Sequence, residues 1–384
     1  MRAVTADHVL FDECIEAFRP FETPIVSGDV ASTHSYLLLG FDLPESWGLP
    51  NCTIHPTIRV HLPGHYVALI SRIDNPEWVG RFNPHLFGIA LASIVSFVTG
   101  RVCGSPRDGY LCRRDQLTDH DLSELALQHP ILIAGPGCVH TSLSRERINS
   151  YYRTLSALIE KLISVKRDTY LIAMQAIRLV HLSLLNKRND FGLAYLLIVS
   201  AIETVAQKAI KRDWVKFTHP SEERWRDRAK AEPELGEVLS RYLEARGKEQ
   251  YLKERYISFI ERFAPVMCWE EIVAHPLQDL ADYVSELSPA HDMAHVVGKH
   301  WFEKYPSDLP QEHIRQILED SYTHRSCYIH RGEQPPHREP TSFNRFFQEY
   351  REYDGLRLTE MLLPNYELLL GIAQRSITSW IGSK

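Results

Sequence analysis

Cysteine chemistry is sparse in this sequence of 384 residues. Its seven cysteines are scattered along the chain, no two of them form a Cys-x-x-Cys pair, and their odd number cannot be matched completely into disulfides. We also find no signal-peptide pattern. These absences argue against a disulfide framework, and we expect the protein to work in a reducing, cytoplasmic compartment.

Long apolar runs and phosphate-binding motifs are missing as well. The densest apolar segment, 86–98, is too short and too interrupted by glycine and serine to span a membrane, so we expect a buried helix there. The loop at 135–137 lacks the Lys-Ser/Thr of a phosphate-binding loop. His291 and His295 have the spacing of a metal pair but lack the glutamate and the third ligand of a zinc-protease helix. We therefore expect no cofactor, no metal and no membrane.

Neither sign of charge dominates the composition, because 43 lysines and arginines stand against 49 aspartates and glutamates, for a formal net charge of −6. This balance argues against broad electrostatic coating of nucleic acid but leaves room for a local basic groove. A basic cluster at Lys208, Lys211, Arg212 and Lys216 could follow an RNA backbone. The alternative is an ordinary solvated helix end.

The chain is long enough, and apolar enough, for two domains with real cores. Residues 1–145 have the pattern of a smaller α+β domain, which we expect to sense or position a target. After about 145, glycine and proline become rare and helical periodicity takes over, so we predict a mainly α protein. The strands predicted in the first part lie at 35–39, 57–62, 66–73 and 131–134.

Residues 146–384 are predicted to form a helical bundle with a helical insertion at about 213–307. The last helix is placed at about 354–382, where Pro364 should kink it or mark its start. Residues 214–234 are polar and are expected to be loop-like. The other predicted helices are 147–164, 168–187, 190–211, 235–245, 249–263 and one near 269–286.

One more predicted helix organises the rest of the chain. Asp308 is its expected N-cap, with Pro310 in the first turn and Gln311 at capping-box spacing, and Gly332 should end it. Apolar or small residues recur in it at helical spacing, and Arg325 falls in their phase. A guanidinium on a packing face needs a carboxylate, a phosphate or a partner chain.

A carboxylate that could meet this arginine is Glu203. It lies between Val199 and Ala206 on the apolar face of the helix predicted at 190–211, where a carboxylate is costly unless it is paired. Glu203 is therefore a candidate partner of Arg325. The alternative is that Glu203 lies at the edge of the apolar stripe and reaches water.

Arg325 and His330 together suit the cleavage of an RNA phosphodiester. The histidine can move the proton of the 2′-hydroxyl or of the leaving oxygen, and the arginine can hold the phosphate and its developing charge. They point roughly 140° apart on an ideal helix, so they flank a broad face unless His330 turns inward as the helix frays. The structural alternative is an arginine that satisfies buried carbonyls and a histidine that caps the helix end.

Residues 325–330, Arg-Ser-Cys-Tyr-Ile-His, match the R-x4-6-H signature of HEPN-domain ribonucleases. With Tyr322 before the arginine, Ser326 after it and 331–333 (Arg-Gly-Glu) after the histidine, the segment most resembles the Apea-like branch, found among bacterial antiphage and toxin systems. The resemblance covers roughly residues 150–384, and its specific part is the motif alone.

This resemblance implies a HEPN-like helical bundle and a homodimer whose two motifs face each other across a twofold axis. It also implies metal-independent endonucleolytic cleavage that leaves 2′,3′-cyclic phosphate ends, and it admits an antitoxin or a phage-derived trigger as a partner. The rival hypothesis is a non-catalytic helical module that dimerises and recruits a partner.

The hypothesis gives each site residue a role. His330 would transfer the proton and Arg325 would clamp the phosphate, with Glu203 and Ser326 in support. For Ser326, a bond back to the helix carbonyls is an equal alternative. The expected substrate-binding residues are Tyr322, His324, Arg331, Lys208 and Lys211.

Overall fold

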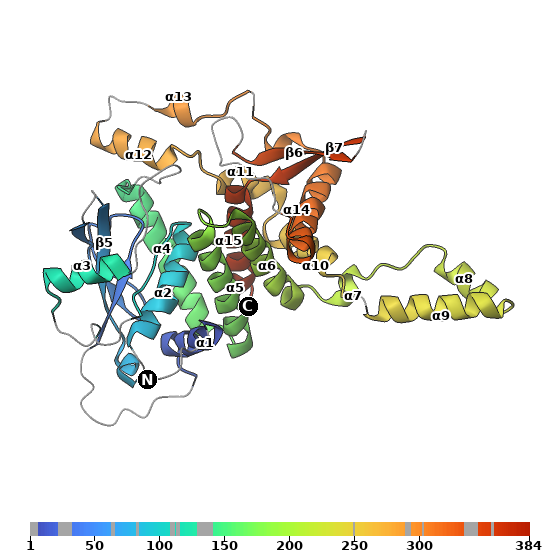
Figure 1. Cartoon of the computed structure of the whole chain (residues 1–384), viewed down its shortest axis with the longest axis horizontal. Coiled ribbons are helices and arrows are strands. Elements are labelled where there is room, and N and C mark those ends of the chain that lie inside the picture. Colours follow the sequence, from blue (N-terminus) through green and yellow to red (C-terminus); the bar gives the residue numbers. More distant parts are fainter. Residues whose placement is uncertain are drawn as a thin grey trace.

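The computed structural model describes residues 7–21, 33–62, 66–81, 84–107, 112, 116–128, 141–248, 250–288, 293–301, 303–333, 345–354 and 357–384. Within these ranges the chain is mainly helical, with a small sheet in its N-terminal region (Figure 1). The predicted mainly α class is thereby confirmed. The strand predicted at 131–134, the glycine-proline loop at 135–137 and His291 lie outside the described residues.

A five-stranded antiparallel sheet forms the centre of the N-terminal region, and its longest strand, β5, pairs with three others. Ile58 lies opposite Ile70 in one of these pairs, and His34 lies opposite Asp74 in another. The strands predicted at 35–39, 57–62 and 66–73 are confirmed to within one residue at each end. The five strands are β1 (His34–Leu38), β2 (Trp47–Gly48), β3 (Thr53–Ile54), β4 (Ile58–Leu62) and β5 (Tyr66–Asp74).

The dense apolar segment forms α2 (Pro84–Thr99), a helix that is buried on nearly every side. It packs against β1 and against three helices, which explains why apolar residues surround it completely. The predicted buried helix is thus confirmed. The other helices of this region are α1 (Asp7–Phe18), η1 (Glu77–Arg81) and α3 (Asp119–Gln128).

The helical part of the chain is built around α6 (Phe191–Ala209), which packs against α5, α10, α14 and α15. By length and composition α6 could cross a membrane, but 61% of its apolar window is buried in the protein, the pattern of a core helix. Asp190 caps it by accepting a hydrogen bond from the amide of Leu193. Around α6 lie α4 (Arg145–Ser164), α5 (Arg167–Asn186), α10 (Leu252–Phe263), α14 (Gln311–Arg331) and α15 (Tyr366–Gly382).

The helices predicted at 147–164, 168–187 and 190–211 are confirmed to within two residues, as α4, α5 and α6. One hydrophobic cluster joins buried side chains of these helices with those of α1, α2 and the sheet. This cluster contains residues from both sides of position 145. The domain boundary predicted there stays a prediction.

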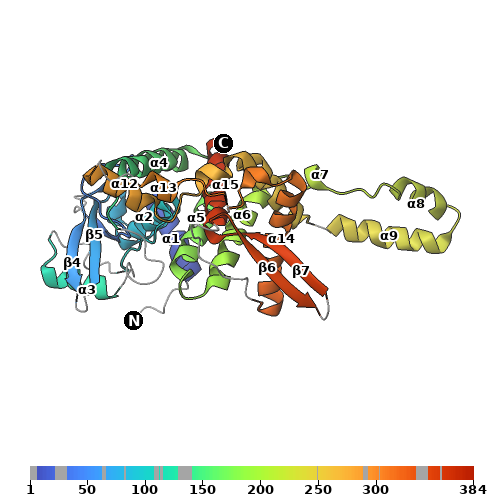
Figure 2. The same cartoon turned by 90° about the horizontal axis from the view of Figure 1, so that it is seen from above.

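The region between α6 and α14 is more structured than the sequence suggested. Residues 214–234, expected to be loop-like, contain α8 (Glu222–Ala229) and the second half of α7 (Arg212–Val215). With α9 (Pro233–Lys248), α8 forms a helical arm that projects from the body (Figures 1 and 2). The helix predicted near 269–286 is two helices, α11 (Trp269–Ile272) and α12 (Gln278–Leu287), because Pro276 disfavours helix in the residue before it. Short turns of helix complete the region, at η3 (Val266–Cys268), α13 (Ala294–Val297) and η4 (Pro306–Asp308).

Of the two possibilities for the last helix, a kink at Pro364 is wrong and a start near Pro364 is confirmed, so the described residues predicted as helix before Pro364 are not helical. Residues 347–364 form a β-hairpin of β6 (Phe347–Asp354) and β7 (Arg357–Pro364), and α15 begins only at Tyr366. Asp354 lies opposite Arg357 in the register, so two residues separate the strands. Pro364 therefore ends a strand just before the helix rather than kinking a helix.

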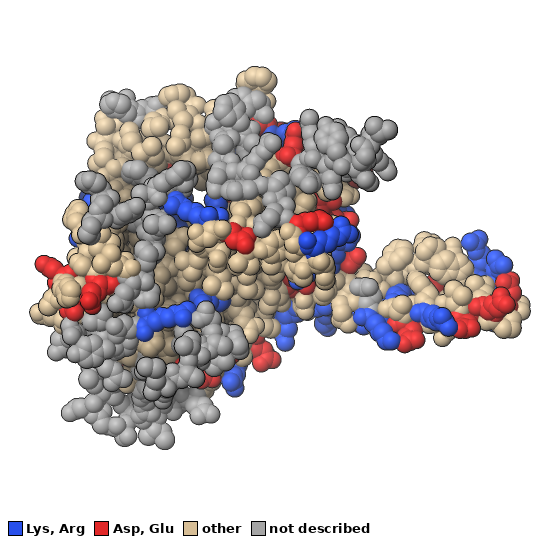
Figure 3. Space-filling model, viewed as in Figure 1, with Lys and Arg blue, Asp and Glu red and all other residues tan. Residues whose placement is uncertain are grey.

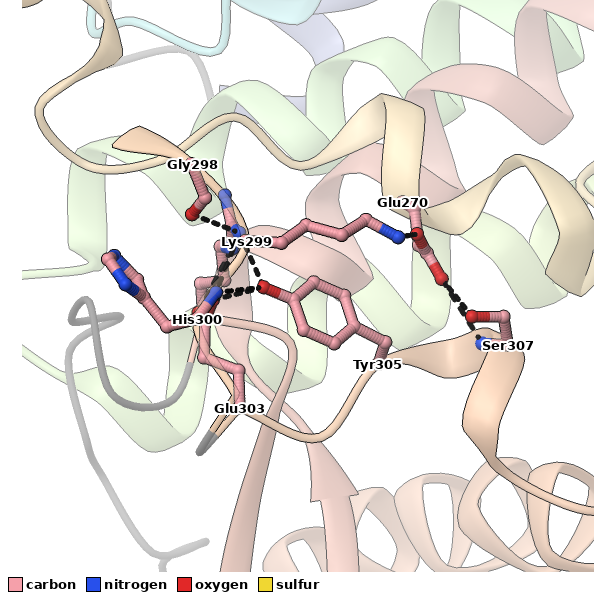
Figure 4. A network of polar contacts seen from close by, with 8 residues as sticks. Glu270, Gly298, Lys299, His300, Glu303, Tyr305 and Ser307 are labelled. Atoms are coloured by element: carbon pink, nitrogen blue, oxygen red, sulfur yellow. Dashed lines mark hydrogen bonds and ion pairs between the residues drawn. The ribbon is translucent and has the colours of Figure 1, made fainter. Parts of the chain in front are cut away.

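A buried ion pair between Arg345 and Glu303 anchors this hairpin to the segment before α14, where Glu303 and Tyr305 belong to one network of polar contacts (Figure 4). Arg345 Nε lies 3.0 Å from Glu303 Oε1, and the two side chains are 8% and 0% exposed. Arg345 Nη2 also donates to Tyr305 Oη at 2.9 Å, and Tyr305 Oη donates to Glu303 Oε2. We call Arg345, Glu303 and Tyr305 the Arg345 clasp. Because β7 packs along α14, which carries the R-x4-H motif, the clasp holds the hairpin beside this motif helix.

The two ends of the motif helix differ from each other in how well they were predicted. Asp308 is not its N-cap: it ends η4, and α14 starts at Gln311 after Pro310, without a side-chain cap. The short 3₁₀ turn explains the shift, because the Asp308 amide already donates to the Tyr305 carbonyl. At the other end Gly332 adopts φ +70° and stops the helix, as predicted.

Candidate functional site

The candidate site lies where α14 crosses α6. Ile314, Ile317, Leu318, Ser321 and Tyr322 form the buried face of α14, as their helical spacing predicted. This face packs against α6 and α10. The next turn of α14 on the same face carries Arg325.

Arg325 and Glu203 form an ion pair, with Arg325 Nη2 2.9 Å from Glu203 Oε2. The Glu203 side chain is 6% exposed and that of Arg325 is 20% exposed. The alternative in which Glu203 reaches water is therefore wrong. The pairing predicted from the phases of the two helices is present, and the arginine still meets solvent on one side.

The other oxygen of this carboxylate also has partners. Tyr322 Oη donates to Glu203 Oε1 at 3.4 Å, and Gln207 Nε2 donates to the same oxygen at 3.2 Å. Burial, together with the nearby Glu203 charge, raises the pKa of Tyr322 to about 12, so its hydroxyl stays a donor at neutral pH. The Arg325 guanidinium carbon lies 5.6 Å from the centre of the Tyr322 ring. Glu203 is thus held from three sides and fixes the orientation of the arginine.

Arg325 keeps unused capacity to bind a ligand. A guanidinium has five N–H donors in a planar fork, and Glu203 engages one terminal nitrogen. Among the described residues, Arg325 Nε has no hydrogen-bond acceptor, but this atom is buried, so only the exposed part of the side chain can meet a ligand. A fixed, partly exposed guanidinium of this kind can bind an anionic oxygen such as that of a phosphate.

His330 lies in the last turn of α14 and is exposed. Among the described residues, no hydrogen bond or ion pair joins it to Arg325 or Glu203, so the inward turn considered from the sequence does not occur. Next to it Ile329 is 47% exposed. One chain therefore offers a fixed arginine and, about 7.5 Å further along the helix axis, a solvent-facing histidine.

Of the remaining predicted residues, one bonds to the helix backbone and two are at least partly exposed. Ser326 Oγ donates to the Tyr322 carbonyl at 3.4 Å, which is the back-bonding alternative rather than a substrate contact. His324 is half-buried, whereas Arg331 is exposed, with Nη1 3.5 Å from Glu333 Oε1. His324 and Arg331 stay candidates for binding a substrate that lies along the C-terminal turns of α14.

Lys208 lies in the last turn of α6 and Lys211 is the N-cap of α7, two residues beyond that helix, and both are exposed. Lys208 is separated from Glu203 by about one to two turns of helix, since both belong to α6. On the face shown in Figure 3, lysines and arginines are interspersed with acidic residues along the arm, in keeping with the net charge of −6. Any nucleic-acid contact must therefore be local.

Sequence reasoning missed several contacts that fix the site. Gln207 could have been found, because it is four residues from Glu203 on one helix. Two tyrosines could not: Tyr256 of α10 shares a hydrogen bond of 3.2 Å with Ser321, and Tyr328 donates to Asp190 at 3.3 Å. These contacts join α14 to α10 and to the start of α6, and no local pattern reveals them.

The described residues hold no cluster of three or more histidine, cysteine, aspartate or glutamate side chains that could bind a metal ion. Comparison with known protein families, curated proteins and solved structures gives no match to this chain. What the site does must therefore be argued from its geometry and chemistry.

Proposed function

We propose that this protein is a metal-independent endoribonuclease whose C-terminal part is a HEPN-like helical bundle. One observation carries the proposal. Arg325 of α14 is paired with the buried Glu203 of α6, and the last turn of α14 exposes His330. The exposed His330 imidazole is open to a substrate, as a proton-transfer group has to be. An enzyme that moves protons near neutral pH needs one.

The reaction would proceed by attack of the 2′-hydroxyl on the adjacent phosphorus. The P–O5′ bond breaks as the 2′-O–P bond forms, which leaves a 2′,3′-cyclic phosphate and a free 5′-hydroxyl. Arg325 would neutralise the charge that develops on the non-bridging oxygens. His330 would take the proton of the 2′-hydroxyl or give one to the departing 5′-oxygen.

Two proton transfers are needed in this reaction, and each motif supplies one exposed histidine. A homodimer that places two copies of α14 together would provide both, with one His330 as base and the other as acid. In such a dimer each motif would meet its own copy. We place this activity in the cytoplasm, in a toxin or antiphage setting, where an antitoxin or a phage-derived trigger would control it.

A non-catalytic dimerisation module is the second candidate, and the same ion pair favours it. Arg325 is already matched by Glu203, so it can serve packing alone. The test is cleavage of total RNA by the purified protein in EDTA, compared with His330→Ala. The matched control is His313→Ala, another exposed histidine of α14.

We expect wild-type protein and His313→Ala to cleave RNA in EDTA, and His330→Ala to be slower by about 10²–10⁴-fold, the usual loss on removing a general acid–base group. Equal rates for all three folded proteins would favour the non-catalytic module.

A further inference from the structure

Two large aromatic side chains are exposed where the arm leaves the body. Trp214 of α7 is 56% exposed and Phe217, three residues later, is 59% exposed. Aromatic side chains usually bury most of their surface in a core or an interface. Two of them open to solvent within one short segment therefore indicate a binding surface.

Two cations lie beside the Trp214 ring. Lys211 Nζ lies 5.8 Å from the centre of the Trp214 ring, and the guanidinium carbon of Arg262 lies 5.6 Å from it. Both distances are at the outer limit of a cation–π contact, so more than half of the tryptophan surface stays open. Two exposed carboxylates, Asp213 and Glu261, lie next to these residues in the sequence. We call Trp214, Phe217, Lys211 and Arg262 the Trp214 platform, and the exposed Lys208 and Lys216 are close to it in the sequence.

The platform continues into the arm as a series of rings. Phe217 meets His219 edge to face at 6.3 Å, and His219 stacks on Trp225 at 4.3 Å with an interplanar angle of 20°. Stacked rings of this kind hold the segment after α7 in place. Trp214 and Phe217 are therefore presented from an ordered base rather than from a loose chain.

The platform also lies close to the proposed catalytic pair. Lys208 follows Glu203 by five residues on α6, which is about 7.5 Å along the helix axis. Arg255 of α10 donates through Nε to the Ile210 carbonyl at 2.9 Å, and so fixes the end of α6 from which α7 departs. The platform therefore begins just after the end of the helix that carries Glu203.

We propose that the Trp214 platform binds single-stranded RNA by stacking unpaired bases on Trp214 and Phe217 while the lysines contact the phosphates. The inference rests on the proposed ribonuclease function and adds a substrate class to it. Duplex RNA hides its base faces, whereas single strands expose them, and aromatic rings flanked by cations are how proteins bind single strands with little sequence preference. A protein partner would explain the rings but not the cations beside Trp214.

The test measures binding separately from cleavage. Full-length protein carrying His330→Ala is titrated against a fluorescein-labelled single-stranded oligoribonucleotide, and its anisotropy gives Kd. Adding Trp214→Ala should weaken binding by about 5- to 150-fold, the equivalent of one lost base stack. Trp214→Phe should restore most of the affinity, because a stacking face returns. The matched control is Trp301→Ala, which removes a tryptophan that is 95% exposed elsewhere on the chain.

Lys211→Ala should weaken binding and make log Kd less dependent on log salt by about 0.7, as expected for one lost phosphate contact to a single strand. A blunt RNA duplex should bind more weakly than the single strand. The inference is overturned if Trp214→Ala binds as tightly as its parent, if Trp301→Ala loses as much, or if Trp214→Ala changes only the oligomeric state seen by light scattering.

Its failure is distinguishable from failure of the proposed function. If wild-type protein cleaves RNA but Trp214→Ala leaves Kd unchanged, the ribonuclease proposal stands and the platform does not bind RNA. If wild-type protein never cleaves RNA but binding depends on Trp214, the platform stands and the catalytic proposal fails.

Discussion

At the scale of single residues, the account depends on one buried charge. Glu203 is almost fully enclosed and its charge is matched by Arg325. Removing one member of such a pair costs more than the pair contributes, because the other charge stays buried without compensation. The ion pair therefore makes a stability prediction that is independent of any enzymatic activity.

Arg325→Ala should lower the free energy of unfolding by about 3 kcal/mol, the low end of the usual range, because the arginine is 20% exposed. Arg325→Lys should lose less, since it keeps the charge but not the planar fork. Adding Glu203→Gln to Arg325→Ala should recover part of the loss. Urea denaturation of the four proteins measures this, and equal midpoints would contradict the buried pair.

His181 makes a prediction about pH. It is buried between Ser93 Oγ, 2.9 Å from Nδ1, and the Cys103 carbonyl, 2.8 Å from Nε2. Burial, with help from the Arg178 charge, lowers the pKa of His181 from 6.5 to about 4. Because the unfolded state takes up this proton first, the stability is fully present above pH 6.5 and is lost as the pH falls towards 4.

Between pH 7 and pH 5 the His181 effect should cost about 2 kcal/mol of unfolding free energy. His181→Gln cannot titrate, so it should be less stable at pH 7 but should lose about 2 kcal/mol less on acidification. Denaturation curves at the two pH values give the comparison. The same pH dependence in both proteins would show that His181 is not the titrating group.

The environment of a residue could be predicted where it interrupts a periodic apolar pattern, and not where tertiary packing decides it. Arg325 and Glu203 were found because each interrupts an apolar stripe in helical phase, which is visible without a structure. The exposure of His330 and the back-bonding of Ser326 depend on how the helix end meets its surroundings. Trp214 and Phe217 carried no signal at all, because a polar segment gives no hint of which rings stay open.

At the scale of elements, the Arg345 clasp has the clearest consequence. It joins the hairpin β6–β7 to Glu303, which is 42 residues away in the sequence. Two-stranded hairpins are marginally stable on their own, so this one depends on what holds it. The clasp and the packing of β7 on α14 supply that support.

Arg345→Ala should release the hairpin and destabilise the protein by about 3–5 kcal/mol, because Glu303 is left fully buried. Amide hydrogen exchange should become faster in β6 and β7 than in α5. The control is Lys304→Ala, which breaks the neighbouring Lys304–Glu349 pair, whose side chains are 55% and 50% exposed and which should contribute little. Similar exchange in both variants would mean that the clasp does not hold the hairpin.

Helices and strands were predicted well where caps and periodicity in the nearby sequence determine them, and poorly where distant contacts do. The central helices were placed to within two residues because their caps and periodicity are encoded nearby, as with Asp190 before α6. The C-terminal hairpin was predicted as helix because its stability comes from Glu303 and α14, neither of which is adjacent in sequence. The arm was missed in part because α8 is so polar that its helical face is hard to recognise.

At the scale of the whole molecule, the proposal requires two copies of the chain. Ile329 is 47% exposed beside His330, so a second copy that packs on this helix end would cover it. Ile329→Asp should therefore weaken dimerisation and reduce cleavage together. Leu277→Asp, at a position that is 41% exposed far from the motif in sequence, is the control. Light scattering measures the mass, and a wild-type protein that is monomeric at working concentration would contradict the composite site.

The most direct test of the central claim is the chemistry of the cut ends. Wild-type protein is incubated in EDTA with a single-stranded oligoribonucleotide, and with the same oligonucleotide carrying a 2′-deoxy sugar at the mapped cleavage position. The account predicts products with 2′,3′-cyclic phosphate and 5′-hydroxyl ends, no cut at the deoxy position, and a loss of about 10²–10⁴-fold in rate for His330→Ala. Cleavage at the deoxy position, or activity that EDTA abolishes and magnesium restores, would contradict it.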